Sequence, residues 1–105
     1  MSRPLTLRLT EAAEDDLADI WATLVVEASE VVATRFVAAI EAEFEPLRHF
    51  PFSGPARDNL AAGLRVTFHS PYAIYYKPLP DAVVIIRVIH GARDIDAIAE
   101  QGGLA

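Results

Sequence analysis

The run Val83-Val84-Ile85-Ile86-Arg87-Val88-Ile89, followed by His90-Gly91-Ala92-Arg93-Asp94, decides the fold of this chain. Valine and isoleucine fill every position of the run except one, a composition typical of a buried β-strand. Arg87 is the exception, and a buried guanidinium is costly unless a partner pairs with it. We therefore expect Arg87 either to brace the sheet, bonded to a carboxylate or to loop carbonyls, or to contact a partner.

Two earlier segments, residues 64–68 and 72–77, have the composition of strands, and the short turns between the three segments predict antiparallel hairpins. Side chains alternate along a strand, so each strand has two faces. One face of the last strand is expected to carry Val84, Ile86, Val88 and His90, and the other Val83, Ile85, Arg87 and Ile89. Whichever face the helices leave open is the candidate interaction surface.

The first half of the chain predicts a strand followed by two helices. Residues 5–9 alternate between apolar and polar side chains, and Thr10 can cap a helix over residues 11–27. Ser29 is the cap expected for a second helix, whose apolar stripe is Val32, Phe36, Ile40, Phe44 and Leu47. Trp21, Phe36 and Phe44 are expected in the core.

These elements predict an α+β fold of order β-αα-βββ, in which an N-terminal strand and a helical hairpin pack on a small, twisted, mostly antiparallel sheet. About half of the residues are apolar, which suits a single domain over residues 1–105. Residues 96–105 are expected to form one helical turn or a loose tail, because Gly102 and Gly103 favour fraying.

The net charge of −6 is unevenly distributed. Residues 1–45 contain three basic and ten acidic side chains, whereas residues 46–105 contain six basic and five acidic ones. This distribution argues against direct binding of nucleic acid, which normally requires a basic face. Cysteine is absent, and no apolar stretch reaches the roughly 18 residues of a membrane span, so we expect a cytoplasmic protein with no membrane contact, no metal and no cofactor.

Several sequence segments resemble the RelE/ParE superfamily of bacterial toxins from type II toxin–antitoxin systems, and together these segments cover residues 5–95. They are the early strand with Ala13 to Trp21, Phe50-Pro51 with Gly54, Asn59-Leu60 with Gly63-Leu64-Arg65, Tyr72-Ala73-Ile74-Tyr75-Tyr76, and Ile86-Arg87-Val88-Ile89-His90-Gly91-Ala92-Arg93-Asp94. The last segment resembles the ParE branch more than the RelE branch.

The two branches imply different activities. RelE-like toxins cleave ribosome-bound messenger RNA without a metal, whereas ParE-like toxins inhibit DNA gyrase by holding its cleaved-DNA state. The acidic charge of this chain and the lack of a tyrosine after Tyr76 favour the ParE-like activity, with no catalytic residue. The alternative is an mRNA endonuclease that uses Arg65, Arg87 and His90, although a histidine beside a glycine is more often packed or turn-bonded than catalytic. A third hypothesis is a toxin-like fold retained only for antitoxin binding or a repressor complex.

The resemblance also implies a site and partners. The residues expected to contact a target or partner are Arg65, Tyr72, Tyr75, Tyr76, Arg87, His90 and Arg93, with no metal ligand among them. A sheet with an aromatic face and an edge strand suits an amphipathic helix and an added strand of a partner. We expect a ParD-like antitoxin to bind this surface, DNA gyrase to be the target, and the free toxin to be able to form a homodimer.

Overall fold

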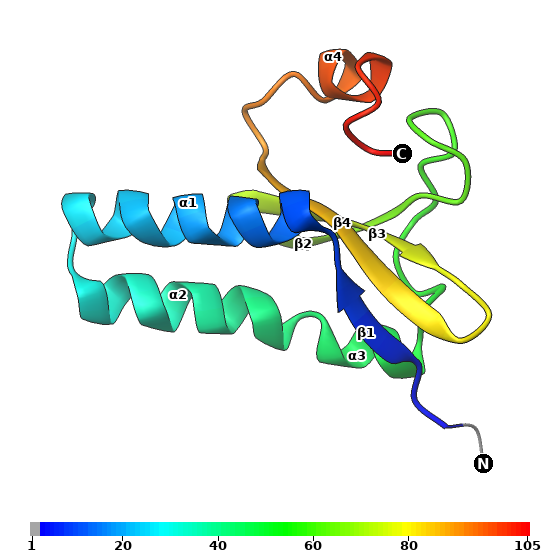
Figure 1. The fold of residues 1–105 in the computed structure, drawn as a ribbon, viewed down its shortest axis with the longest axis horizontal. Helices are drawn as coiled ribbons and strands as arrows, with labels where there is room; N and C mark the ends of the chain where they lie inside the picture. Colours follow the sequence, from blue (N-terminus) through cyan, green and yellow to red (C-terminus); the bar gives the residue numbers. More distant parts are fainter. Residues whose placement is uncertain (1–2) are drawn as a thin grey trace.

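The elements of the chain follow the predicted order in the computed structural model, which describes residues 3–105. They are β1 (Thr6–Leu9), α1 (Glu11–Glu27), α2 (Glu30–Ala42), α3 (Glu45–His49), β2 (Arg65–His69), β3 (Tyr72–Pro78), β4 (Ala82–His90) and α4 (Ile95–Glu100). The α+β fold of order β-αα-βββ is confirmed, with the short helices α3 and α4 in addition (Figure 1).

Two polar side chains start the helices of the hairpin. The Thr10 hydroxyl accepts a hydrogen bond from the backbone N–H of Ala13, and the Ser29 hydroxyl accepts one from Val32. Each side chain satisfies a backbone donor that the first turn of a helix leaves free. The sequence therefore located both ends of α1 and the break at Ser29 correctly.

The strands form one sheet in the order β1-β4-β3-β2, with β1 parallel to β4 and the other pairs antiparallel. Because β1 is short, it pairs only with Ala82 to Ile85 of β4. The second half of β4 therefore has no strand on that side, and its backbone groups need other partners.

A β-bulge in β4 overturns the predicted alternation of its side chains. Tyr75 pairs with Arg87 and Tyr76 with Ile85, so Ile86 is an extra residue on β4. Ile85 and Val88 consequently pack in one core and Ile86 and Ile89 in the other, whereas strict alternation had grouped Ile85 with Ile89. A bulge inserts one residue and shifts every following side chain to the opposite face.

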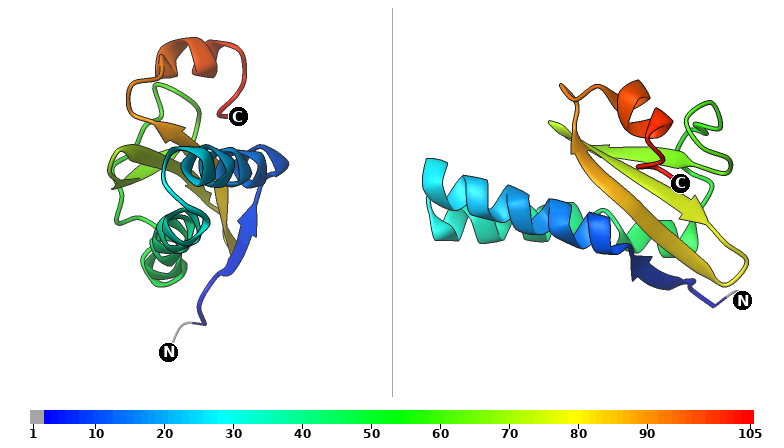
Figure 2. Two further views of the ribbon diagram at one scale, coloured as in Figure 1. Left: turned by 90° about the vertical axis from the view of Figure 1, so that its left-hand side faces the viewer. Right: turned by 45° about the horizontal axis from the view of Figure 1, so that its top comes forward.

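The sheet has a core on each face. The hairpin core lies under α1, α2 and α3, and its buried side chains include Leu17, Ile40, Phe44, Tyr76 and Ile85. The second core lies on the other face, under α4 and residues 57–63, and contains Leu64, Val66, Tyr75, Ile86 and Leu104. Figure 2 shows the hairpin and α4 on opposite sides of the sheet.

The distal half of the hairpin extends past the sheet (Figures 1 and 2). No residue of α1 after Ile20 is buried. Trp21, predicted in the core, is 37% exposed, and its indole N–H donates to the Thr34 hydroxyl. The prediction was wrong because the apolar stripe of α1 is longer than the surface that the sheet offers it.

The last residues are more ordered than a loose tail. Asp94 caps α4 by accepting from Ala97 N–H, and Leu104 is fully buried in the second core. Gly102 has a positive φ of 77°, which turns the chain back toward the sheet after α4.

Candidate functional site

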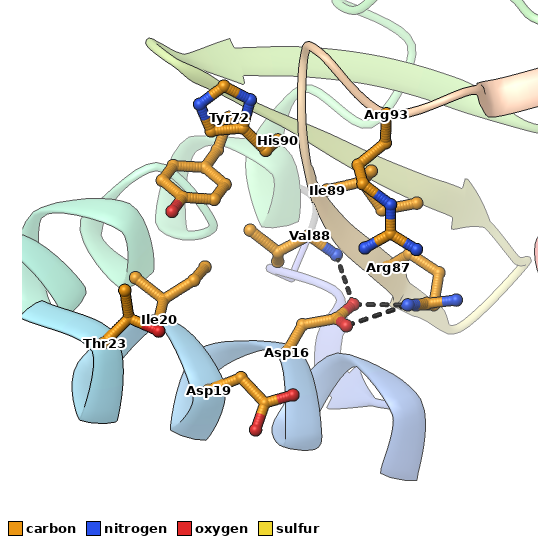
Figure 3. Close-up of a pocket in the computed structure, with 10 residues that line it drawn as sticks. All are labelled: Asp16, Asp19, Ile20, Thr23, Tyr72, Arg87, Val88, Ile89, His90 and Arg93. Carbon is orange, nitrogen blue, oxygen red and sulfur yellow. Dashed lines mark hydrogen bonds and ion pairs between the residues drawn. The ribbon is translucent and has the colours of Figure 1, made fainter.

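The guanidinium of Arg87 is held by Asp16 of α1 (Figure 3). Its Nε donates to Asp16 Oδ2 at 2.7 Å and its Nη2 to Oδ1 at 2.9 Å, which is a bidentate pair. Both side chains are largely buried, with 19% and 13% of their surfaces exposed. The hydrogen bond to Asp16 is the main cause that raises the pKa of Arg87. Arg87 was expected either to brace the sheet or to contact a partner. Its bonds within the chain fit the first role, because they tie β4 to α1.

Asp16 also closes the free edge of β4. The backbone N–H of Val88 donates to its Oδ2 at 2.9 Å. Thr10, just before α1, donates to the carbonyls of Ile85 and Ile86. These bonds replace a strand neighbour where β1 has ended. The Asp16 carboxylate therefore pairs with the charge of Arg87 and also accepts a hydrogen bond from the Val88 N–H, which has no strand partner.

A cavity of about 190 Å³ lies between α1 and the end of β4. It is lined by four predicted site residues, Tyr72, Arg87, His90 and Arg93, and Figure 3 shows the α1 residues along its opposite wall. Asp19 and Thr23 line that wall and were missed by sequence reasoning. They lie one and two turns after Asp16, so the helical period of α1 could have placed them beside it.

An aromatic row runs across the sheet beside this cavity. His69, Tyr72 and His90 are direct neighbours in the register of β2, β3 and β4. The Tyr72 ring packs edge-on against His90 at 5.3 Å and against Phe36 of α2 at 5.9 Å. Burial, reinforced by the charge of Glu27, raises the pKa of Tyr72. His69 was not predicted as a site residue, because its place in the row depends on strand register.

His90 is oriented by its own turn. Its Nδ1 accepts a hydrogen bond from the backbone N–H of Ala92 at 3.0 Å, and the residue is exposed. This bond places the proton of a neutral imidazole on Nε2, which leaves Nε2 as the atom able to bond a partner.

Arg65 lies away from this group. Its guanidinium donates to the carbonyls of Phe52 and Gly54 and stacks over the Phe52 ring at 4.9 Å. Arg65 is opposite Tyr76 and His90 is opposite Tyr72, so four residues of β3, or about 13 Å, separate them along the strands. Arg65 and His90 therefore do not converge on one point.

The two remaining predicted site residues are buried. Tyr76 is fully buried, and its hydroxyl accepts from Gly54 N–H at 3.0 Å. Tyr75 is 8% exposed in the second core, and burial raises its pKa. Tyr76 therefore has no surface to offer a partner in this structure.

Within residues 3–105, no three histidine or acidic side chains are grouped as metal ligands. The helices in this part of the chain are too short or too polar to cross a membrane.

Comparison with known proteins identifies the family. The sequence model of one protein family, described as the ParE toxin of the type II toxin–antitoxin system parDE, matches residues 7–95. The chain belongs to the ParE toxin family. The match includes β1 from its second residue, the hairpin, β2 to β4 and every residue that lines the cavity between α1 and β4.

Two solved structures share the fold of this ParE family member. The chromosomal ParDE system from P. aeruginosa superposes with a TM-score of 0.74 at 23% identity, covering 85% of this chain and 98% of that one. The toxin–antitoxin complex RelBE2 from Mycobacterium tuberculosis gives a TM-score of 0.59 at 26% identity, covering 84% and 99%. No curated protein sequence matches the chain.

Proposed function

We propose that this ParE family toxin acts in the cytoplasm by inhibiting DNA gyrase and is neutralised by a ParD-like antitoxin. The observation that carries the proposal is the engagement of Arg87 by Asp16. An endonuclease of the RelE type would need Arg65, Arg87 and His90 around one phosphate. Here Arg87 is bonded to a carboxylate and Arg65 to two carbonyls at a distance from His90.

The proposed target surface is the rim of the cavity between α1 and β4. Tyr72, His90 and Arg93 line it, and Arg93 forms no ion pair within residues 3–105. Arg87 supports this rim by fixing the end of β4 against α1. A protein target suits the surface better than RNA, because the acidic hairpin beside it would repel a phosphate backbone.

The proposed antitoxin surface includes the exposed apolar side chains of the hairpin. Val26 is 86% exposed, Val31 60% and Val32 46%. Clustered aliphatic side chains on a projecting hairpin are typical of a surface that a partner covers. Both solved structures similar to this chain belong to toxin–antitoxin systems, which supports an antitoxin as that partner.

The test uses purified protein in two reactions. In a DNA gyrase reaction with plasmid, the wild type should trap cleaved DNA and block supercoiling. With ribosomes and messenger RNA, transcripts should remain intact. Site-specific cleavage of the transcript with unaffected gyrase would overturn the proposal.

Arg93→Ala is expected to weaken gyrase trapping by about tenfold, the loss of one good charged contact. Arg8→Ala is the matched control, because Arg8 of β1 is also an exposed arginine without an ion pair among residues 3–105 but does not line the cavity. Equal trapping by Arg93→Ala and the wild type would remove the cavity rim from the proposed target surface.

A further inference from the structure

The outer edge of β4, on the side of β1, loses its hydrogen-bond partners along the strand. β1 pairs with this edge only as far as Ile85, and Thr10 then bonds the carbonyls of Ile85 and Ile86. Asp16 accepts from the Val88 N–H at 2.9 Å. Beyond that bond, no strand and no side chain of residues 3–105 is hydrogen-bonded to the edge. The end of β4 is therefore an open strand edge.

Two backbone groups remain on this open edge, the Val88 carbonyl and the His90 N–H. The Gly91 N–H donates to the Pro71 carbonyl on the β3 side, whereas the Val88 N–H points the other way, toward α1. Backbone groups alternate in direction along a strand, so the His90 N–H points the same way as that of Val88. Within residues 3–105, neither the Val88 carbonyl nor the His90 N–H has a hydrogen-bond partner on that side. One acceptor and one donor are thus left in the spacing of a strand.

The cavity between α1 and β4 lies against these two groups. Val88 and His90 both line it, and Ile20 and Thr23 of α1 lie on its opposite wall (Figure 3). A strand added to β4 would lie about 4.8 Å from it. The cavity of about 190 Å³ provides open space there. A helix, which is about 10 Å across with its side chains, is too wide for a cavity of this size, so the shape favours an extended chain with small side chains.

The charges around the cavity favour a peptide backbone over an anion. Asp19 on α1 and Arg93 after β4 both line it, and neither forms an ion pair within residues 3–105. A phosphate attracted by Arg93 would also be repelled by Asp19 and by Asp16 beside it. A peptide backbone carries no net charge and presents a donor and an acceptor in every residue.

The geometry points to this open edge as the place where an extended segment of the toxin's protein target adds a short strand to the sheet. A backbone N–H of the segment donates to the Val88 carbonyl, and a backbone carbonyl accepts from the His90 N–H. Small side chains of the segment pass between α1 and β4. This inference rests on the proposed function in taking the rim of the cavity as the target surface, but it does not require the target to be gyrase.

Proline at position 90 tests the His90 N–H directly. His90→Pro removes this donor, and the strand tolerates proline there because the N–H faces away from β3. His90→Ala is the matched control, because it removes the imidazole and its bond to Ala92 but keeps the backbone N–H. In a DNA gyrase reaction with plasmid, His90→Pro should trap cleaved DNA at least about tenfold less well than His90→Ala. Equal trapping by the two folded variants would overturn the inference.

A second pair of variants tests the cavity from the α1 side, whether or not His90→Pro folds. Thr23→Phe places a ring in the cavity, whereas Ala22→Phe places one at a neighbouring exposed position that does not line it. Both positions are exposed, so both variants should fold. Thr23→Phe should trap cleaved plasmid about tenfold less well than Ala22→Phe, because the added strand no longer fits. Equal trapping by these two variants would contradict an occupant inside the cavity.

Hydrogen exchange on the free wild type tests whether the edge is open. The Val88 amide is bonded to Asp16 and should be protected. The His90 amide, two residues later on the same edge, should exchange at least about tenfold faster. Equal protection of the two amides would show that the edge is already closed and would overturn the inference.

Growth of a bacterial host that expresses each variant separates this inference from the proposed function. A wild type that arrests growth without trapping cleaved plasmid would refute gyrase as the target. His90→Pro should still need at least about tenfold more inducer than His90→Ala to arrest growth, because the added strand is required for any target. A fully toxic His90→Pro that escapes a co-expressed ParD-like antitoxin would overturn the inference, because the antitoxin would then be the occupant of the edge.

Discussion

The two faces of the sheet are covered by different means. On the hairpin face, helices pack along the sheet, and polar bonds from Thr10 and Asp16 fasten α1 to β4. On the other face, residues 94–105 form a strap that is held by Leu104 and three half-buried side chains, without a hydrogen bond to the rest of residues 3–105. Both faces bury aliphatic side chains completely, so burial alone does not tell the two covers apart, whereas the polar bonds between cover and sheet do.

Removing a buried aliphatic side chain on the hairpin face should have the largest effect. Ile85 is fully buried under α1, which cannot leave the sheet without breaking its bonds to β4. Ile85→Ala should lower the free energy of unfolding by about 3–4 kcal/mol, the cost of a cavity that cannot collapse. Urea denaturation measures this loss, and a loss under about 1 kcal/mol would contradict a rigid hairpin face.

Breaking the Arg87–Asp16 pair should be the next largest change. Asp16→Ala leaves a mostly buried guanidinium unpaired and the Val88 N–H without its acceptor, so we expect a loss of about 2–3 kcal/mol by urea denaturation. Asp15→Ala is the matched control, because Asp15 is its exposed neighbour on α1 and should change stability by less than about 0.5 kcal/mol. Equal effects at the two positions would show that the pair does not brace the sheet.

Leu104→Ala should cost less than Ile85→Ala, although both side chains are fully buried. When Leu104 is truncated the strap can detach instead of preserving a cavity, which limits the loss to about 1–2 kcal/mol. Hydrogen exchange should show faster exchange in α4 and unchanged protection in α1. Loss of protection in both helices together would mean that the two faces unfold as one unit.

Alkaline pH should produce the smallest effect. The pKa values of Tyr72 and Tyr75 are raised above the ordinary 10.0 mainly by burial. The unfolded chain therefore loses these protons first, so stability is constant below about pH 10 and falls as the pH rises through the higher pKa values of the folded state. Urea denaturation from about pH 9 to about pH 11 should show this fall, and Tyr75→Phe should reduce it. In Leu104→Ala, removal of the strap should bring the pKa of Tyr75 back toward its ordinary value.

The fold was predictable from sequence because each of its signals is local. Thr10 and Ser29 begin helices through hydrogen bonds to residues three positions later. Residues 83–89 are recognisable as a strand because all of them except Arg87 are valine or isoleucine. The family resemblance was confirmed over residues 7–95.

The features that the sequence did not predict depend on contacts between residues that are distant in sequence. The bulge at Ile86 follows from pairing with β3, and the partner of Arg87 lies 71 residues away on α1. Four of the residues predicted to contact a partner, Tyr72, Arg87, His90 and Arg93, line one cavity, but the sequence could not separate Arg65 from them without the register of β2 and β3.

One double variant tests the central claim that Arg87 braces the sheet and does not touch the target. Asp16→Asn with Arg87→Met removes both charges, while the side-chain carbonyl introduced at position 16 can still accept from Val88 N–H, so the protein should fold. Its inhibition of DNA gyrase, measured as trapped cleaved plasmid, should remain within a few-fold of the wild type. A folded double variant that no longer traps cleaved plasmid would contradict the account and make Arg87 a contact of the target.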